Sequence, residues 1–280
     1  MKVSLCITVF NEEKSIERLL ESLEKQTRKA DEIIIVDAGS TDKTIEIIKK
    51  YSEVKLTISK RASISKGRNI AITKAKYEII VMTDAGCICD KNWIKNITKP
   101  FDKKETDVVA GFYNMAGNTN FQKALKPFLG IMPEKFDQNN FLPSTRSIAF
   151  RKKVWEKVNG FDKRFDKAGE DTDFNIKILK NNFKVVRVKN ALVDWEVPNN
   201  LISAMKKFYY YARGDAQSKR ISKHNIKVLT IFGRYFLFII FWPIIIVYLI
   251  YAYWKAGLWG TIIQVSSDFA IMAGFTNGIF

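Results

Sequence analysis

The sequence predicts an α/β protein with a mostly parallel sheet flanked by helices, followed by a hairpin of two C-terminal transmembrane helices. In the first 112 residues, short runs rich in β-branched residues alternate with amphipathic helical stretches, which is typical of parallel strands joined by right-handed crossovers. Near the C-terminus, 20 consecutive residues carry no charge, enough to cross a bilayer core of about 30 Å. We therefore divide the chain into a sheet domain over 1–200, a basic amphipathic juxtamembrane region over 201–230 and a membrane segment over 231–280.

Five short runs rich in β-branched residues are the expected strands of the sheet. They cover residues 3–10, 32–36, 54–58, 77–83 and 107–112. Helical periodicity between them predicts helices over 15–25, 43–51 and 66–75. Residues 114–143 form a long connection, which predicts a binding loop, a lid or a second packed layer. A strand and a short helix are expected over 144–162, and a further helix begins near Glu170.

Polar side chains follow three of the expected strands, at the point where each strand ends. The first strand leads into residues 8–12, the second into Asp37, and the fourth into Asp84. In open sheets of this type, ligands bind beyond the carboxyl ends of the strands, so we expect these exits to converge on one site. A tight turn at Gly39 with a helix cap from Asp42 explains those two residues but not Asp37.

Asp84 follows a buried strand, at a position where many nucleotide-dependent enzymes hold a metal ion. Sites of that kind usually have a second carboxylate one or two residues later, but Ala85 and Gly86 occupy those positions. No Gly-x-Gly-x-x-Gly turn follows the first strand, and the sequence has no Gly-x-x-x-x-Gly-Lys-Ser/Thr motif. These features weigh against a dinucleotide oxidoreductase and a P-loop phosphotransferase.

Three carboxylates in four residues, Glu170, Asp171 and Asp173, stand at the start of an expected helix. Acidic side chains stabilise helix N-termini, so a purely structural role is one interpretation. Capping needs only one carboxylate, however, and adjacent carboxylates repel each other. The cluster is therefore also a candidate catalytic site.

The charge and hydropathy of the chain favour a membrane partner over nucleic acid. The chain has 46 Lys and Arg against 29 Asp and Glu, a formal net charge of +17. Many basic residues precede the uncharged run 235–254, namely Lys206, Lys207, Arg213, Lys219, Arg220, Lys223, Lys227 and Arg234. By the positive-inside rule, this flank and the sheet domain lie on the cytoplasmic side of the cell membrane. Pro243 predicts a kink within the run, and residues 261–280 predict a return helix, with an interfacial helix as the alternative.

The three cysteines, Cys6, Cys87 and Cys89, are too few for a disulfide framework, so we expect reduced thiols. Cys87 and Cys89 are interpreted as packing residues, with soft metal ligands as the alternative. The sequence opens directly into the strand-like "KVSLCITVF", and we expect no signal peptide.

Six motifs in one order carry a family resemblance. They are "SLCITVFNEEKSIERLLESLEKQT", "DEIIIVDAGSTDKTIEII", "KGRNIAI", "VMTDAG", "FRKKVWEKVNGFD" and "GEDTDF". Over residues 3–215, the chain resembles the inverting glycosyltransferases of family 2, which have the Rossmann-like GT-A fold. The tail "FYYYARGDAQSKR" and the apolar segments after it are similar to the membrane-attached bacterial and archaeal members. The resemblance implies sugar transfer from a nucleotide-diphosphate sugar to a hydroxyl of a lipid-linked or glycan acceptor.

The resemblance also implies roles for individual residues. Those expected to bind the nucleotide-sugar are Thr8, Val9, Phe10, Asn11, Glu12, Asp37, Arg68, Asp84, Thr145, Arg146 and Ser147. Asp84 matches the first carboxylate of the Asp-x-Asp motif, and Gly86 stands where the second would be. Asp171, with Glu170 beside it, matches the catalytic base that takes the proton from the acceptor hydroxyl.

A divalent cation, Mg²⁺ or Mn²⁺, would stabilise the negative charge on the departing nucleotide diphosphate. One carboxylate is a poor site for such an ion unless phosphate oxygens add ligands. Many GT-A enzymes place a metal-binding histidine near the end of the last strand, where this chain has Asp194. We therefore expect Asp194 to complete the site with Asp84 and the diphosphate; a solvent-facing turn residue is the alternative.

The acceptor is expected to bind near the membrane. Arg213, Lys219 and Arg220 would contact the phosphate of a lipid carrier or the anionic headgroups of membrane lipids. Glycosylation of free polyprenyl phosphate has little need for a base, so the Glu170–Asp171 pair favours a hydroxyl acceptor. A polyprenyl-phosphate glycosyltransferase is the nearest alternative, and a catalytically silent, membrane-anchored nucleotide-sugar-binding protein is another, because of Gly86.

Overall fold

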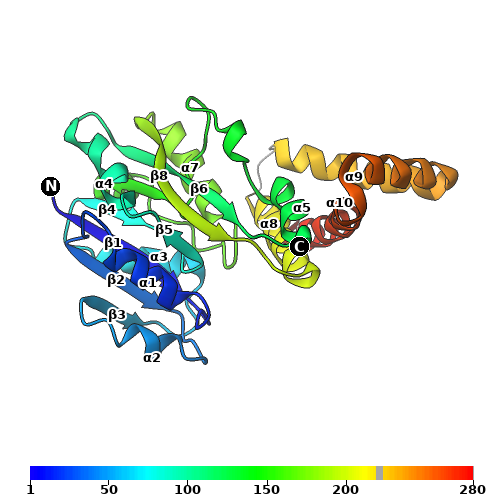
Figure 1. The fold of residues 1–280 in the computed structure, drawn as a ribbon. Coiled ribbons are helices and arrows are strands. Elements are labelled where there is room, and N and C mark those ends of the chain that lie inside the picture. The colour runs from blue at the N-terminus through cyan, green and yellow to red at the C-terminus, as the bar shows by residue number, and fades with distance from the viewer. Residues whose placement is uncertain (219–222, 280) are drawn as a thin grey trace. The chain divides into compact units, whose positions relative to one another are not determined.

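The computed structural model describes residues 1–218 and 223–279 and contains an eight-stranded sheet (Figure 1). The strand order is β3-β2-β1-β4-β7-β6-β8-β5. The strands are β1 (Val3–Val9), β2 (Glu32–Asp37), β3 (Val54–Ile58), β4 (Ile79–Met82), β5 (Cys87–Cys89), β6 (Val108–Ala116), β7 (Ile148–Arg151) and β8 (Val185–Glu196). The first four form the expected parallel half, since β1 pairs in parallel with β2 and β4, and β2 with β3.

The other half of the sheet is mixed rather than parallel. Strand β7 runs antiparallel to both β4 and β6, and β5 runs antiparallel to β8, whereas β6 and β8 are parallel. Strand β6 extends beyond the expected residue 112, because it pairs with β8 as far as Ala116 across a bulge between Gly111 and Phe112. A Cβ atom on Gly111 would lie 1.9 Å from the Ser147 hydroxyl oxygen, so this close approach requires glycine.

Helices cover the sheet and bury its apolar side chains. They are α1 (Ile16–Glu24), α2 (Thr44–Ile48), α3 (Ile64–Lys74), α4 (Trp93–Thr98), α6 (Lys152–Lys157) and α7 (Glu170–Lys180), with a 3-10 turn η1 (Lys99–Asp102). One core joins strand residues such as Cys6 and Phe150 to Ala71 of α3 and Phe174 of α7. Each fully buried phenylalanine contributes about 1.5–3 kcal/mol to folding, so this core fixes α3 and α7 against the sheet.

The long connection expected over 114–143, for which a binding loop, a lid and a second packed layer were the alternatives, contains a helix, α5 (Asn120–Leu129), and a 3-10 turn, η2 (Pro133–Lys135). Thr119 and Gln122 form a capping box at the start of α5: the Thr119 side chain accepts from the Gln122 backbone N–H. Pro127 lies in the last turn of α5, where it removes a single backbone hydrogen bond.

By its internal packing, the chain divides into two compact units. The first contains the sheet, and the second contains Gly117–Ile131, Lys167–Gly169 and the chain from Val197 onward. The second unit consists of α5, α8 (Leu201–Gln217), α9 (Lys223–Ile240) and α10 (Pro243–Ile279). A Cβ atom on Gly274 would lie 2.1 Å from the Tyr209 carbonyl oxygen, so glycine allows α10 to pack closely on α8.

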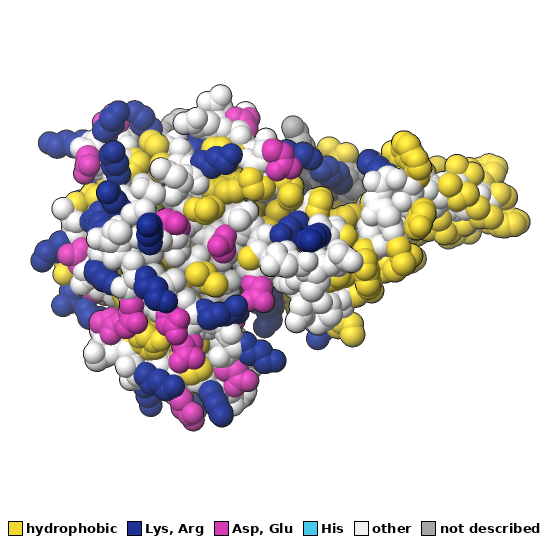
Figure 2. All heavy atoms as spheres, viewed as in Figure 1, with side chains coloured by type: hydrophobic (Ala, Val, Ile, Leu, Met, Phe, Trp, Pro, Cys, Tyr) yellow, Lys and Arg dark blue, Asp and Glu magenta, His cyan; other side chains and the backbone are white. Residues whose placement is uncertain are grey.

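The apolar tail does not form one kinked helix over 235–254. Helix α9 ends at Ile240 and α10 begins at Pro243, which takes the first helical position, where its missing N–H costs nothing. Gly257, with a φ of 66°, interrupts the helical geometry within α10. Of the helices that the structure describes, α10 alone is long and apolar enough to cross a membrane, by length and composition. Figure 2 shows hydrophobic side chains over the surface of this tail.

Candidate active site

The centre of the candidate site is Arg68, a buried residue of α3 whose side chain is 2% exposed. Its Nη2 donates to Asp84 Oδ1 at 2.9 Å and to Thr145 Oγ1 at 2.8 Å, and its Nη1 donates to Glu170. Arg68 therefore brings together residues that follow β4, precede β7 and begin α7. We call Arg68, Asp84, Thr145, Glu170 and Asp171 the Arg68 cluster.

The position of Arg68 follows from the packing of α3. Ser63 caps the helix, since its hydroxyl accepts from the Lys66 backbone N–H. Gly67 lies against Thr8 of β1, where an added Cβ would be 2.9 Å from the Thr8 methyl carbon. The absence of a side chain at Gly67 lets α3 approach the carboxyl end of β1, and the next residue, Arg68, then points into the interior.

The three carboxylates at the start of α7 have different environments. Glu170 pairs with Arg68, and burial raises the pKa of the Glu170 carboxyl although Arg68 acts in the opposite direction. Asp173 pairs with Lys177 at 2.8 Å, one turn along the same helix. Asp171 is partly exposed and has no salt bridge among the described residues. The repulsion expected among these three carboxylates is therefore relieved by Arg68 and Lys177, and Asp171 is the one of the three that has no salt bridge among the described residues.

The exits of β1 and β2 are joined by hydrogen bonds, as expected for one site at this edge of the sheet. Asn11, with a φ of 54°, donates its backbone N–H to Ser40 Oγ and accepts from the Thr41 backbone N–H at 2.9 Å. The Glu12 backbone N–H donates to Thr44 Oγ1 at 2.7 Å. Between Thr8 and Asn11, Val9 is buried, whereas Phe10 is 49% exposed.

Asp37 corrects one step of the sequence interpretation, because the turn does explain this residue. Its side chain is buried, and its Oδ1 accepts from the backbone N–H groups of Gly39 at 2.7 Å and Ser40 at 2.8 Å. Its Oδ2 accepts from the Ser40 hydroxyl at 2.6 Å. The carboxylate therefore holds the turn between β2 and α2.

The three residues Thr145, Arg146 and Ser147 have three different roles. Thr145 belongs to the Arg68 cluster, whereas Ser147 is buried, accepting from the Trp93 indole N–H at 2.8 Å and donating to the Ala191 carbonyl at 2.9 Å. The Arg146 guanidinium lies 3.9 Å from the centre of the Trp195 ring and 5.0 Å from that of Tyr113.

Sequence reasoning missed Tyr113 and Trp195, the aromatic partners of Arg146. Trp195 lies in the segment "NALVDWEVP", in which only the acidic residues indicated a site. Tyr113 follows the expected end of its strand. Period-2 alternation of buried residues near the end of β8, with Val193 and Trp195 on one face, is the signal that could have found Trp195.

The structure does not bring Asp194 to Asp84. Asp194 lies opposite Ile88 in the β5–β8 pair, and its Oδ1 accepts from Asn114 at 3.3 Å. Asp84 instead pairs with Arg68 through Oδ1 and keeps a side chain that is 33% exposed. Among residues 1–218 and 223–279, no three His, Cys, Asp or Glu side chains form a group that could hold a metal ion. The residues present fit a divalent cation only where phosphate oxygens join Asp84 as ligands.

The remaining residues singled out in the sequence are the three cysteines and the basic residues before the apolar tail. All three thiols are free and buried, which is typical of packing residues, and burial raises the pKa of Cys87 to about 12. Arg213 lies in α8 of the second unit, and Lys219 and Arg220 lie outside the described residues.

Two family models match the chain: Glycosyl transferase family 2 over residues 4–161, and Glycosyl transferase family group 2 over residues 135–276. The chain belongs to glycosyl transferase family 2. The resemblance carried by its six sequence motifs is thereby confirmed.

Curated relatives of this glycosyl transferase come from archaea and bacteria. A dolichyl N-acetyl-alpha-D-glucosaminyl phosphate 3-beta-D-2,3-diacetamido-2,3-dideoxy-beta-D-glucuronosyltransferase of Methanococcus voltae is 25% identical over 93% of this chain and 86% of its own length. The glycosyltransferase GlyA of Streptococcus pneumoniae is 23% identical over 79% of this chain. The chain spans only 34% of GlyA.

Solved structures share the fold. Staphylococcus aureus TarS in complex with UDP has a TM-score of 0.57 at 25% identity, covering 77% of this chain and 64% of that one. The mannosyltransferase PcManGT of Pyrobaculum calidifontis, in complex with GDP-Man and Mn²⁺, has a TM-score of 0.61 at 19% identity, covering 77% and 62%.

Proposed function

We propose that this protein transfers a sugar from a nucleotide-diphosphate sugar to a hydroxyl group of a lipid-linked or glycan acceptor, with inversion at the anomeric carbon. The observation that carries the proposal is the Arg68 cluster, which unites Asp84 with the Glu170–Asp171 pair in a chain of glycosyl transferase family 2. The relative from M. voltae is named for action on a dolichyl-linked sugar phosphate, and TarS structures hold UDP and UDP-GlcNAc. The TarS complexes support a nucleotide-sugar donor, and the relative from M. voltae supports a lipid-linked acceptor.

Within the cluster, Asp171 would act as the general base. As the acceptor oxygen forms its bond to the anomeric carbon, the bond from that carbon to the diphosphate oxygen breaks, and the hydroxyl proton passes to Asp171. Glu170 is buried and paired with Arg68, so it would act as a positioning residue rather than as the base. The residues at the β1 and β2 exits would bind the nucleotide, and Thr145 and Arg146 would lie beside the donor sugar.

The charge of the cluster supports a divalent cation, Mg²⁺ or Mn²⁺. Arg68 is one cation among three carboxylates, Asp84, Glu170 and Asp171, so the cluster has an excess of negative charge. A donor diphosphate adds more, and like charges at short range repel strongly in a partly buried site. Asp84 and the phosphate oxygens would hold the ion, which neutralises charge on the leaving group.

The second unit supports attachment to a membrane. Helix α10 is long and apolar enough to span a bilayer, and Arg234 and Tyr235 of α9 contact Asp268 of α10. These contacts favour a helical hairpin, because they pair the only carboxylate of α10 within the helices. The basic residues before α9 favour a cytoplasmic location for the sheet unit.

The test is thermal unfolding of the full chain in detergent with UDP-, GDP- and CMP-sugars, each with and without Mn²⁺. One donor at about 100 times its Kd should raise the unfolding temperature by roughly 5–10 °C, with a larger rise when Mn²⁺ is present. That donor is then offered with a lipid-linked sugar or with free polyprenyl phosphate. Transfer to the lipid-linked sugar supports the proposal, whereas transfer to polyprenyl phosphate alone supports the alternative. A chain that binds and turns over no nucleotide-sugar would contradict both.

A further inference from the structure

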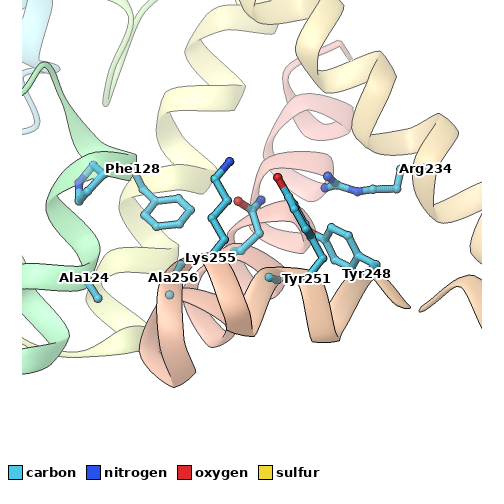
Figure 3. A pocket seen from close by; sticks show the side chains of 11 residues that line it. Ala124, Phe128, Arg234, Tyr248, Tyr251, Lys255 and Ala256 are labelled. Atoms are coloured by element: carbon cyan, nitrogen blue, oxygen red, sulfur yellow. The ribbon is translucent and has the colours of Figure 1, made fainter. Parts of the chain in front are cut away.

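A cavity in the second unit has a composition unlike that of the surface around it. Its volume is about 590 Å³, and it is lined by residues of α5, α9 and α10, with no member of the Arg68 cluster among them. One part of the lining is apolar, including Phe128 of α5 and Ala252 and Ala256 of α10. The other part is cationic and hydroxylated, with Arg234, Lys255 and Tyr251 (Figure 3).

The two cations of the cavity differ in how they are paired. Arg234 forms an ion pair with Asp268, which also accepts hydrogen bonds from Tyr235 at 3.2 Å and Gln264 at 3.0 Å. Lys255 has no carboxylate partner among the described residues, and its ammonium lies 5.7 Å from the Tyr251 ring centre. Since Lys255 and Asp268 are the only charged residues of α10, Lys255 is the one whose charge is unbalanced.

An unbalanced cation in an apolar helix is costly unless an anion accompanies it. Figure 3 shows the Lys255 ammonium and the Tyr251 hydroxyl pointing the same way, with the Arg234 guanidinium directed toward the tyrosines. The Nε–H of Arg234 is buried and has no acceptor among the residues that the structure describes. Lys255, Tyr251 and Arg234 thus offer a positive charge and hydrogen-bond donors to an anion.

We propose that this cavity binds the phosphate group of a lipid, with its first chain segment against the apolar wall. The apolar surfaces of α9 and α10 continue beside it, with side chains such as Ile239 and Trp254 more than 80% exposed, which suits an amphiphile rather than a free anion. The inference rests on the proposed function, in which that lipid phosphate is part of the lipid-linked acceptor. It moves the phosphate contact from Arg213, Lys219 and Arg220 to Lys255 and Arg234.

The test measures binding of a polyprenyl phosphate to the full chain in detergent micelles, by native mass spectrometry. The same titration uses the matching polyprenol, phosphatidic acid, and inorganic phosphate. We expect polyprenyl phosphate to bind at least about tenfold more tightly than polyprenol, because the alcohol lacks the charge-assisted contact. Equal binding of phosphatidic acid supports a site for lipid phosphates in general. Inorganic phosphate binding as tightly as the lipid would overturn the proposal.

Three variants localise the site. Lys255→Gln should weaken polyprenyl phosphate binding about tenfold, and Ala256→Trp, which fills the cavity without changing its charge, should weaken it similarly. Lys227→Gln removes an equal charge from an exposed position on α9 outside the cavity and should change binding less than twofold. Equal losses in Lys255→Gln and Lys227→Gln would show general attraction to charge, and unchanged binding in Lys255→Gln or Ala256→Trp would place the site elsewhere.

Measuring donor binding in the same variants distinguishes failure of the lipid site from failure of the proposed function. Each variant is heated with the stabilising nucleotide-sugar, and Lys255→Gln should keep the full donor-induced rise in unfolding temperature, which also shows that it folds. Lipid binding that depends on Lys255 in a chain that binds no donor would support the lipid site and contradict the transferase. If the chain binds the donor and transfers sugar, but its lipid binding does not depend on Lys255, the result would support the transferase and contradict the lipid site.

Discussion

Two arginines, Arg68 in the sheet unit and Arg234 in the helical unit, each pair with a buried carboxylate, but the charge balance of the two sites is opposite. Arg68 is 2% exposed and pairs with both Asp84 and Glu170, so its cluster has an excess of negative charge. Arg234 is 31% exposed and, among the described residues, pairs with Asp268 as its one carboxylate, while Lys255 lines the same cavity, so that site has an excess of positive charge. The first arrangement suits a cation and the second an anion, although both are built on an arginine–carboxylate pair.

The largest effect is expected for Asp171→Asn, which removes one of the three carboxylates that give the Arg68 cluster its excess of negative charge. Because Asp171 would accept the acceptor proton, we expect transfer to fall at least about a thousandfold, while the donor-induced rise in unfolding temperature stays within experimental error. Glu156→Gln, an exposed carboxylate on α6, is the control for loss of a charge and should transfer at the wild-type rate. If Asp171→Asn retains transfer within a few-fold, the base is another residue.

Arg68→Gln tests how much the sheet unit depends on its arginine. Glu170 would remain buried without its cation, and we expect a loss of about 3–5 kcal/mol in the free energy of unfolding, measured by urea titration. Arg234→Gln should cost less, since Arg234 is partly exposed and Asp268 keeps its other donors. The double variant Arg68→Gln/Glu170→Gln should recover most of the loss. A double variant no more stable than Arg68→Gln would mean that the buried charge is not the cause.

Gly86→Asp tests whether the sheet unit lacks a carboxylate that it has room for. A Cβ atom at this position would meet nothing closer than Trp195 Cδ1 at 4.0 Å, so packing permits the change. We expect the Mn²⁺ concentration for half-maximal activity to fall about tenfold, because a second carboxylate joins Asp84. Asp194→Ala is the matched comparison and should leave that concentration unchanged, because Asp194 lies opposite Ile88 and accepts a hydrogen bond from Asn114. A shift with Asp194→Ala would restore Asp194 as a ligand.

The smallest expected effect is that of Asp268→Asn in the helical unit. This change keeps the shape of the side chain but removes the only carboxylate of α10, which increases the positive excess around Arg234 and Lys255. We expect polyprenyl phosphate to bind about two- to fivefold more tightly in the titration described above. Weaker binding would show that Asp268 is needed to orient Arg234, and the charge comparison would then fail.

The parallel half of the sheet could be predicted because its signal is local. Strands β1 to β4 are short runs rich in β-branched residues, and the helices between them have apolar residues at helical spacing. Helix α5 was not predicted within the connection 114–143, because Pro127 obscured a helix whose start is indicated by the capping box of Thr119 and Gln122. Pro243 was expected to bend one helix, yet it begins a new one, since a proline satisfies either pattern in sequence.

The five residues of the Arg68 cluster were all singled out in the sequence, but their connections were not predictable. The exits of β1, β2 and β4 could be placed together from topology alone, because parallel strands end at one edge. The partners of Arg68 could not be predicted, since they come from three separate segments. Asp37 and Ser147 proved to bond within the fold, and no sequence pattern distinguishes such a residue from one that contacts a ligand. The sequence shows Lys255 as a single charge between apolar runs. Its cavity could not be predicted, because α5, which is distant in sequence, forms part of the lining.

The ion pair between Arg68 and Glu170 joins residues 102 positions apart, and this separation sets an order for synthesis of the site. At rates of about 5–20 residues per second, Glu170 is made roughly 5–20 s after Arg68. Asp84, only 16 positions after Arg68, is the first carboxylate that the nascent chain can offer to this arginine. The N-terminal strands can therefore assemble on the ribosome with Arg68 already neutralised, whereas the proposed base, Asp171, is added only when α7 leaves the exit tunnel. A truncated chain ending before α7 would contain the expected donor-binding exits without the proposed catalytic carboxylate.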